Sequence, residues 1–522
     1  MTGYLFKILP GNISYNKTLP VLVALLVLSG LIITASPAFS SEKDFEKTGI
    51  FSIETTDARD NKVNSEENLP GEDSDNINRE FVTLEDCIHL AFERHPSLRQ
   101  SFALREAARA RVVQSRASFY PSLGLSSSYS HSVSKTTRTQ SGVVLPVAVS
   151  RTDYYSNRVS VNQMVYDFGR TRYRVLSASE NLKAAHYDLL AEADAIILAI
   201  REAYFKSVAA RKAFEVQQEA VFQQELHLKQ ARGFYEIGRR SKIEVTKAEV
   251  DLAEAELELI RAENALNLSR YVLANTIGIK GSFDYALDDQ VQMAEVEMSR
   301  DEAVEFARAR RPEMLRMSAL EKINEAGLNI ARAAYYPRIN SSGGLGYGDN
   351  RLAFEDFSWN WGVTLQFDIF TSGERAGAVQ EATQQLEAQV ASRDRLWQNI
   401  HLEVQEAFLN KEEARKRIAV VEKTLDNARE NFALAQGRYE VGLSDNLEFN
   451  DARLALQRAK MSLISAVLDY QTARARLEKA TGTTLLARLK IEEMGDSPVE
   501  FMETSPPDEN PPGDKDGEPD GK

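Results

Sequence analysis

The chain has 522 residues and is poor in aromatic side chains (8%) and in proline (15 residues), while Ala, Glu, Leu, Arg and Gln dominate its long central stretches. This composition is typical of long helices rather than of one compact mixed domain. The single cysteine, Cys87, excludes an intrachain disulfide and a cysteine-rich metal site. We expect its thiol to be partly buried on a short helix. No basic face stands out, so nothing supports nucleic-acid binding.

The formal charge of −14 lies mostly in two flanking segments. Residues 41–80 carry twelve acidic against five basic side chains, and residues 495–522 carry nine acidic against two basic ones. Both segments are poor in large apolar side chains, so they cannot bury enough surface to offset the entropy lost on ordering. We therefore expect an acidic disordered linker over 41–80 and an acidic disordered tail over 495–522.

Residues 1–40 have the pattern of a signal peptide. Lys7 and Lys17 precede the apolar run Val21–Ile33, and small residues around Ala38 follow at a cleavage position. The run is shorter than the about 20 residues of a transmembrane helix, although an uncleaved anchor is the alternative. No cysteine follows it at a position for lipid attachment, and no later apolar run approaches spanning length. If the mature protein crosses a membrane, it must do so with strands.

The rest of the chain consists of two copies of one unit. Arg94-His95-Pro96 matches Arg310-Arg311-Pro312 at an offset of 216 residues. Further along, the offset falls to 204 and stays constant, so that Gly278 matches Gly482. Constant offsets over so long a stretch indicate an internal repeat. The two copies span 81–282 and 283–494.

Each copy has the same expected elements in the same order. A short helix ends before Pro96 or Pro312, and a second helix runs to a Tyr-Pro pair, where proline stops it. Two strands and a very long helical hairpin follow. The twelve-residue difference between the two offsets places a longer loop in the first copy, around 135–152. The expected strands are 122–134, 154–168, 338–348 and 357–370, and the expected hairpins are 171–278 and 374–482.

The fourth strand is the clearest of the four. Phe357, Trp359, Trp361, Val363 and Leu365 alternate with polar residues or glycine, which predicts a half-exposed strand. Segments of about ten alternating residues with aromatic residues near their ends suit a transmembrane barrel whose apolar face meets lipid. A soluble sandwich is the alternative, but two distant pairs of strands cannot build its core. Four strands cannot close a barrel around a pore either, so they need partners from other chains.

The hairpin segments have the pattern of coiled coils. Between Thr171 and Gly278 there is no proline, and the only interior glycines are Gly233 and Gly238. Apolar residues recur at helical spacing, with charged faces elsewhere. A cytoplasmic coiled coil is the alternative, but the export signal and the strands argue against it.

These features together resemble the TolC family of outer-membrane factors over residues 81–494. In duplicated order the motifs are specific. They are the opening helix from Leu84 to Pro96, the two Tyr-Pro pairs, the strand ends Val165–Gly169 and Ile369–Gly373, and the tip sequence Arg438–Asp445.

The resemblance implies a mixed α and β membrane protein that assembles as a homotrimer. Each chain would give four strands to a twelve-stranded β-barrel in the outer membrane, continued by a long periplasmic α-helical coiled-coil barrel. The hairpin tips would form the inner aperture and meet a periplasmic adaptor protein. The adaptor would connect the channel to an inner-membrane transporter, either an ABC transporter or a proton-driven one. The implied location is the cell outer membrane, with outer-membrane lipid around the barrel.

The resemblance also places candidate functional residues at the tips. The aperture of the family is often narrowed by acidic side chains with a tyrosine before the tip, and these positions correspond to Glu448, Asp451 and Tyr439. Three copies of both acids around a threefold axis would favour cations. The alternative is that both acids are solvated helix carboxylates. The adaptor-contact candidates are Val441, Gly442, Leu443, Ser444 and Asp445 at the second tip and Gly238 at the first.

One departure from the family concerns charge at the tips. Some members carry a basic residue at the position of Ser444, which helps to hold the aperture shut. Here the corresponding basic residues lie at the first tip, and they are Arg239, Arg240 and Lys242. We hypothesise that these bases pair across the tip with acids such as Asp445 or Glu448.

The sequence contains no recognisable catalytic or cofactor-binding motif. The six histidines are scattered, and none lies in an HExxH motif. There is no GxxxxGK[ST] phosphate-binding loop, so energy for transport must come from a partner, and there is no GxSxG elbow. We therefore expect neither an enzyme nor a bound cofactor or metal.

The leading functional hypothesis is a passive exit duct recruited by a transporter and an adaptor. It could serve type I protein secretion or the efflux of drugs or metals. The lack of a lipidation cysteine and the strand end Tyr166–Gly169 lean toward protein secretion. A periplasmic adaptor is the rival from another class, since adaptors also have long hairpins, but they lack paired transmembrane-type strands. A purely structural coiled coil of the envelope is a third possibility.

Overall fold

The computed structural model describes residues 81–136, 139–140, 143–144, 148–289, 298–351, 356–441, 443–444 and 446–482. All of them belong to one of the two units into which the chain divides, Ile77–Lys522. The expected signal peptide (1–40) and the two expected acidic segments (41–80 and 495–522) lie outside the described residues.

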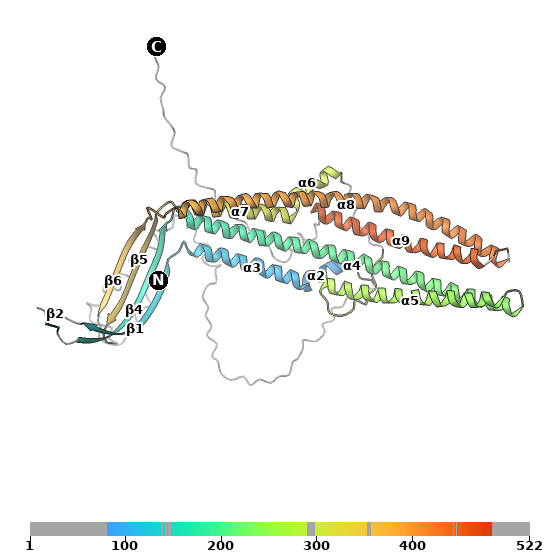
Figure 1. The fold of residues 1–522 in the computed structure, drawn as a ribbon, viewed down its shortest axis with the longest axis horizontal. Helices are drawn as coiled ribbons and strands as arrows, with labels where there is room; N and C mark the ends of the chain where they lie inside the picture. The colour runs from blue at the N-terminus through green and yellow to red at the C-terminus, as the bar shows by residue number, and fades with distance from the viewer. Residues whose placement is uncertain are drawn as a thin grey trace, which may run out of the picture. The chain divides into compact units, whose positions relative to one another are not determined.

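Two series of elements with matching helix lengths follow one another along the chain (Figure 1). In each series a helix of 11 residues and a helix of 22 residues precede the strands, and helices of 67 and 36 residues follow them. The first series has α2 (Leu84–Arg94), α3 (Pro96–Ala117), β1 (Ser122–Thr136), β4 (Ala148–Tyr166), α4 (Arg170–Glu236) and α5 (Lys242–Ile277). The second has α6 (Arg300–Arg310), α7 (Pro312–Ala333), β5 (Arg338–Asp349), β6 (Phe357–Gln366), α8 (Glu374–Glu440) and α9 (Asn446–Thr481).

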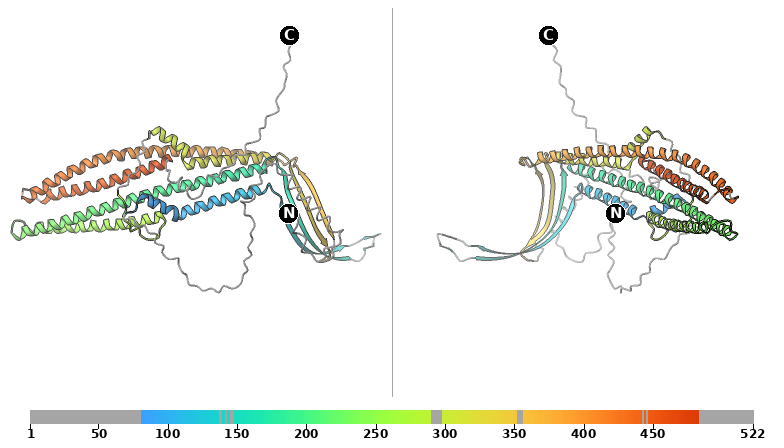
Figure 2. Two further views of the ribbon diagram at one scale, coloured as in Figure 1. Left: turned by 180° about the vertical axis from the view of Figure 1, so that it is seen from behind. Right: turned by 45° about the vertical axis from the view of Figure 1, so that its right-hand side comes forward.

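The four long strands form one antiparallel sheet in the order β1-β4-β5-β6 (Figures 1 and 2). Within the first series β1 pairs with β4, within the second β5 pairs with β6, and β4 pairs with β5 across the two series. The outer strands, β1 and β6, each have one edge that no strand of this sheet occupies. Unpaired backbone N–H and C=O groups along such an edge are able to pair with a further strand.

Two strand boundaries differ from the expected ones by four residues or more. β4 begins at Ala148 instead of 154, because β1 and β4 pair continuously as far as Thr136 and Ala148. Part of the insertion expected as a loop around 135–152 therefore lengthens this ladder, and its described remainder contains the small pair β2 (Thr139–Gln140) and β3 (Val143–Val144). β6 ends at Gln366 instead of 370, because its last partner, Arg338, directly follows Pro337, which has no N–H to donate.

The four hairpin helices lie side by side in the order α8, α9, α4 and α5 (Figure 1). Each 67-residue helix packs against a 36-residue helix and against at least one 22-residue helix. Thus α4 contacts α5 and α9, and also α3 and α7. Among the helices that the structure describes, none combines the length and the apolar character of a membrane-spanning helix.

The matching glycines found in the sequence lie at equivalent helix junctions. Gly278 ends α5 with φ +92°, and a Cβ atom placed on it would lie 2.9 Å from the Cα atom of His95, at the junction of α2 and α3. Gly482 follows α9 with φ +67°, and its Cβ atom would lie 3.1 Å from the backbone N of Arg311, at the junction of α6 and α7. Only glycine combines this backbone conformation with such close approach. The helix end and the helix junction therefore meet backbone to backbone in both series.

The first junction encloses the largest apolar core among the described residues. Side chains of α2, α4 and α5 pack there with Phe283 and Leu287, which follow α5. Tyr204 is fully buried, and its Oη donates to the carbonyl oxygen of Asp288 at 2.7 Å. Cys87 is also fully buried, which corrects the expectation of partial burial, because α2 is covered by α4 and α5. Burial, together with the negative charge of Asp86, raises the pKa of its thiol to about 12.

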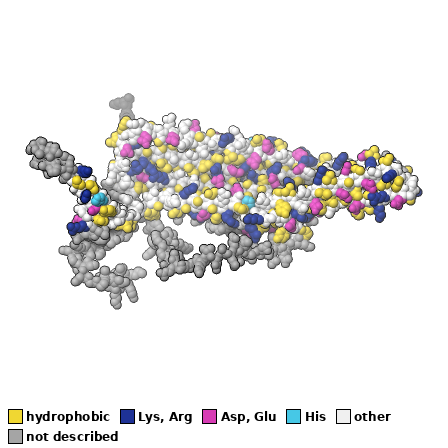
Figure 3. Space-filling model, turned by 60° about the horizontal axis from the view of Figure 1, so that its bottom comes forward, with side chains coloured by type: hydrophobic (Ala, Val, Ile, Leu, Met, Phe, Trp, Pro, Cys, Tyr) yellow, Lys and Arg dark blue, Asp and Glu magenta, His cyan; other side chains and the backbone are white. Residues whose placement is uncertain are grey.

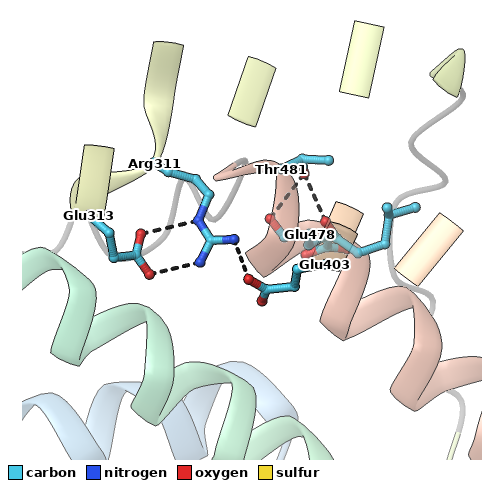
Figure 4. A network of polar contacts seen from close by, with 6 residues as sticks. Arg311, Glu313, Glu403, Glu478 and Thr481 are labelled. Carbon is cyan, nitrogen blue, oxygen red and sulfur yellow. Dashed lines mark hydrogen bonds and ion pairs between the residues drawn. The ribbon is translucent and has the colours of Figure 1, made fainter. Parts of the chain in front are cut away.

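The second junction has a smaller apolar core and is held by charge (Figure 4). Arg311 is 4% exposed. Its guanidinium donates to Glu313 through Nη2 and Nε at 2.9 and 3.2 Å, and to Glu403 through Nη1 at 2.6 Å. The nearby Glu478 pairs with Arg201 of α4. This network therefore connects α7 with α8, and Glu478 connects α9 with α4.

Candidate functional site

The first hairpin tip lies between Glu236 and Lys242. The chain reverses there through Gly238, whose φ is +72°, a conformation that favours glycine. The backbone N–H of Arg239 donates to the carbonyl oxygen of Phe234 at 2.9 Å, which closes the turn. The side chains of Arg239 and Lys242 are exposed at this tip, whereas Arg240 is half-buried.

Arg240 connects the two tips. Its Nη1 donates to Glu244 of its own hairpin at 3.1 Å, and its guanidinium carbon lies 5.6 Å from the ring centre of Tyr439 in the other hairpin. A guanidinium within about 6 Å of an aromatic ring is attracted by the ring electrons. The structure therefore brings Arg240 and Tyr439 together, as two of the expected aperture residues, and adds Glu244, which the sequence did not single out.

Tyr439 lies in an aromatic cluster between the hairpins. Its ring stacks on Phe449 of α9 at 5.1 Å between centres and lies 5.6 Å from the ring of His227 of α4. The side chain is 3% exposed, and this burial raises the pKa of its phenol, although the positive charge of Arg240 acts in the opposite direction. Tyr439 is thus a packing residue between the tips as well as a partner of Arg240.

The expected aperture acids lie beside a groove of about 640 Å³ on the second tip. Glu448 accepts a hydrogen bond from the Oγ of Ser444 at 2.6 Å and lies 3.6 Å from Nη2 of Arg438. Asp451 lies one turn further along α9. The groove is lined by Asn431, Leu443, Ser444, Leu447, Glu448, Asp451 and Ala452.

The hypothesis that first-tip bases pair with second-tip acids stays a prediction, although each tip has an ion pair within its own hairpin. Arg240 contacts Glu244 and Tyr439, while Glu448 has Arg438 of its own hairpin as an ionic neighbour. Asp445, the other proposed acid, lies outside the described residues, as does Gly442. Pairing between neighbouring chains stays a prediction.

The adaptor-contact candidates differ in exposure. Val441 and Leu443 are 70% and 74% exposed, whereas Ser444 is buried because its hydroxyl faces Glu448. The first tip carries two comparable apolar residues that sequence reasoning missed, Ile237 and Ile243, at 65% and 78% exposure. Their signal in the sequence is an apolar side chain on each side of the Gly238 turn, where a solvated tip would be polar.

The strands carry a second feature of the site, an exposed apolar face. Leu123, Leu125, Trp359, Trp361 and Leu365 are all more than 60% exposed on it. Aromatic side chains gather where the strands meet the helices, and there the ring of Phe168 stacks on Tyr336 at 5.1 Å and meets Tyr166 at 4.7 Å. Aromatic residues at the ends of an apolar band are typical of strands in a membrane.

In the described part of the chain, no group of three or more His, Cys, Asp or Glu side chains could hold a metal ion.

The comparison with known families decides the identity. The family model described as outer membrane efflux protein matches residues 87–278 and 303–483, which is one match to each series of elements. The chain belongs to this family.

Individual relatives of this outer membrane efflux protein support the assignment. The toluene efflux pump outer membrane protein TtgC of Pseudomonas putida is 23% identical over 407 residues, which cover 76% of this chain and 82% of TtgC. The alkaline protease secretion protein AprF of Pseudomonas aeruginosa is 24% identical over 424 residues, covering 78% and 85%. The crystal structure of the Campylobacter jejuni CmeC outer membrane channel has the same fold, with a TM-score of 0.68 and 18% identity over 78% of this chain and 88% of that one.

The family resemblance expected from the sequence is therefore confirmed. The protein is an outer-membrane export channel, and its location in the outer membrane is confirmed as well. The rival hypothesis of a periplasmic adaptor is not favoured.

Proposed function

We propose that the protein is a passive exit duct formed by three copies of this chain. The observation that carries the proposal is the pair of unoccupied edges on a four-stranded sheet whose apolar face is exposed. Pairing β1 of one chain with β6 of the next would occupy every edge, and three chains would give a closed twelve-stranded barrel with its apolar face toward lipid.

The helices have matching unoccupied flanks. α5 and α8 lie at opposite ends of the helix row. On α5, Ile243, Val250 and Leu257 follow one another at seven-residue spacing and are 47–78% exposed. On α8, Leu402 and Leu409 have the same spacing and are 57% and 58% exposed. Such stripes are what helices bury against a neighbour in a coiled coil, so α5 of one chain would pack on α8 of the next.

The duct has no chemistry of its own in this proposal. The tips, with Val441 and Leu443 exposed, would meet a periplasmic adaptor, and an inner-membrane transporter reached through that adaptor would supply the energy. The named relatives belong to a toluene efflux pump and to alkaline protease secretion. Both subtypes of cargo, small molecules and proteins, are therefore represented among the relatives of this chain.

The tips would control the inner opening. Glu448 and Asp451 in three copies would form an acidic ring. Arg240 would hold the two hairpins of each chain together through Tyr439 and Glu244. Reversing the charge of Arg239 and Arg240 should then raise the conductance of reconstituted channels, and an unchanged conductance would contradict a closing role.

Cell fractionation and mass measurement test the proposal directly. The full chain should be recovered with the outer membrane, and the detergent-solubilised protein should have three times the chain mass of 58.4 kDa, less any cleaved signal. The inner-membrane protein of the same cells is the control for the fractionation. Recovery only with the inner membrane, or as a monomer, would contradict the duct.

A further inference from the structure

The polar face of the sheet has an unusual charge composition. We call this the inner face; it consists of the even-numbered residues of the strands, from Ser122 to Ser134, Ser150 to Asn162, Arg338 to Gly348 and Ser358 to Gln366. Apart from Tyr154 and two arginines, Arg158 and Arg338, its residues are Ser, Thr, Asn, Gln and Gly. Within these ranges the one acid is Asp153, an odd-numbered residue of β4, and Asp356 lies just before β6, where its carbonyl oxygen accepts from the backbone N of Gly348. On the helical surface in Figure 3, by contrast, basic and acidic side chains are interspersed.

Arg158 is held flat across the inner face. It stands opposite Gly346 on β5, and its Nη1 donates to Oδ1 of Asn360 on β6 at 2.8 Å. The side chain passes over Gly344, where a Cβ atom would lie 3.2 Å from both Nη1 of Arg158 and Oδ1 of Asn360. The absence of a side chain at Gly344 thus leaves room for the guanidinium, and the neutral Oδ1 of Asn360 fixes its position without neutralising its charge.

Tyr154, two inner-face positions before Arg158 on β4, also lies over a glycine of β5. A Cβ atom on Gly348 would lie 2.2 Å from its Oη, so the phenol occupies the space above that glycine. Two donors, the phenol of Tyr154 and the guanidinium of Arg158, therefore stand on the inner face of β4, with Ser156 between them. A phenol and a guanidinium are both donors that can bind an oxyanion.

Positive charge continues to the start of the helices. Arg338 is the first residue of β5 and pairs with Gln366 on the inner face. Burial lowers the pKa of Arg170, at the start of α4, and the positive charges of Arg338 and Arg174 lower it further, whereas the negative charge of Asp167 raises it. These guanidinium groups are therefore close enough to repel one another, in a region where an anion would relieve the repulsion.

We propose that the inner face is an anion-binding strip, in which Arg158 is the principal group and Arg338 the second. The inference rests on the proposed trimeric barrel, in which this face would line the passage. Six guanidinium groups from three chains, within a wall of low dielectric, would attract the carboxylate, phosphate or sulfate groups of a cargo as it passes. The barrel would thus select for charge of the opposite sign to that favoured by the acids Glu448 and Asp451 at the tip.

The test uses full-chain trimers in planar lipid bilayers and inositol hexakisphosphate as the probe, added on the side of the strands. Arg158→Gln/Arg338→Gln removes both charges, and Arg158→Lys/Arg338→Lys is the matched control that keeps them. Wild type and the lysine variant should be blocked at similar probe concentrations, whereas the glutamine variant should need about tenfold more. Its reversal potential in a KCl gradient should also move toward cation selectivity.

Two results would overturn the inference, and they are distinguishable. Wild-type channels that conduct normally but are not blocked by the probe would contradict the anion-binding strip without contradicting the proposed duct. A glutamine variant that is blocked at the same probe concentration as wild type would have the same meaning. Wild-type trimers that insert into the bilayer and form no pore would contradict both the proposed duct and the anion-binding strip.

Discussion

Arg311 shows how one side chain can replace an apolar core at a helix junction. Its counterpart in the first series is His95, whose Nδ1 accepts a hydrogen bond from the backbone N–H of Ser97. The side chains packed around this first junction are apolar. At the second junction the packing is thinner, and Arg311 bonds Glu313 and Glu403 instead. A buried guanidinium is tolerated only when carboxylates satisfy it, so these three residues depend on one another.

Removal of Arg311 should therefore be costly. Arg311→Ala is expected to lower the free energy of unfolding by about 2 kcal/mol, less than a fully buried pair would lose because both carboxylates are partly exposed. Thermal unfolding followed by circular dichroism measures the change. Arg429→Ala is the matched control, because the pair of Arg429 with Asp426 is exposed and should contribute less than about 1 kcal/mol. Equal effects of both substitutions would contradict the account.

The same network predicts sensitivity to acid. Burial by itself would raise the pKa of Glu313, but the hydrogen bonds from Arg311 outweigh it and hold the pKa below the ordinary 4.5. The folded-state pKa is thus depressed, so the stabilisation is present above pH 4.5 and is lost as the pH falls through the lower, folded-state pKa. Unfolding curves from pH 6 to pH 3 should converge for wild type and Arg311→Ala. A constant difference between them would exclude this linkage.

At the scale of elements, the sequence predicts those helix ends and strands that neighbouring residues determine by themselves. Helix ends follow from Pro96, Pro312, Gly278 and Gly482, and the strands follow from alternation. The length of β4 could not be predicted, because residues 148–154 lack a clear apolar alternation and become a strand only by pairing with β1. The contacts between the two hairpins could not be predicted from the sequence either. Gln457 donates to Gln217 at 2.8 Å and Asn450 to Asp251 at 2.8 Å, and long polar side chains of this kind carry no pattern that names a partner.

Two helix glycines, Gly278 at the end of α5 and Gly327 inside α7, should respond to alanine with changes in stability of opposite sign. Gly278→Ala should destabilise the protein by about 2 kcal/mol or more, because the left-handed conformation and the backbone of His95 both oppose a methyl group. Gly327→Ala should stabilise it by about 0.5–1 kcal/mol, because Gly327 lies inside α7 and a Cβ atom there would meet nothing within 4 Å. Urea unfolding of the two variants measures both changes. A stabilising Gly278→Ala would show that the junction is not closely packed.

At the scale of the whole molecule, the single chain has surfaces that other chains would have to cover. Its sheet has two unoccupied edges, and its helix row ends in two exposed apolar stripes. The sequence predicted the need for other chains from the small number of strands, whereas the flanks α5 and α8 emerged only from the packing order of the helices. The tips were located by resemblance, but the bridge from Arg240 to Tyr439 joins residues almost 200 positions apart and required the fold.

The most direct test of the proposed duct is single-channel recording from the purified trimer in a planar bilayer. The account predicts discrete, uniform conductance steps, with one step for each inserted trimer and no requirement for nucleotide or an ion gradient other than the driving voltage. Heat-dissociated monomers should give no steps. A trimer that inserts into the bilayer, as shown by its protection from added protease, and yet carries no current would contradict the account.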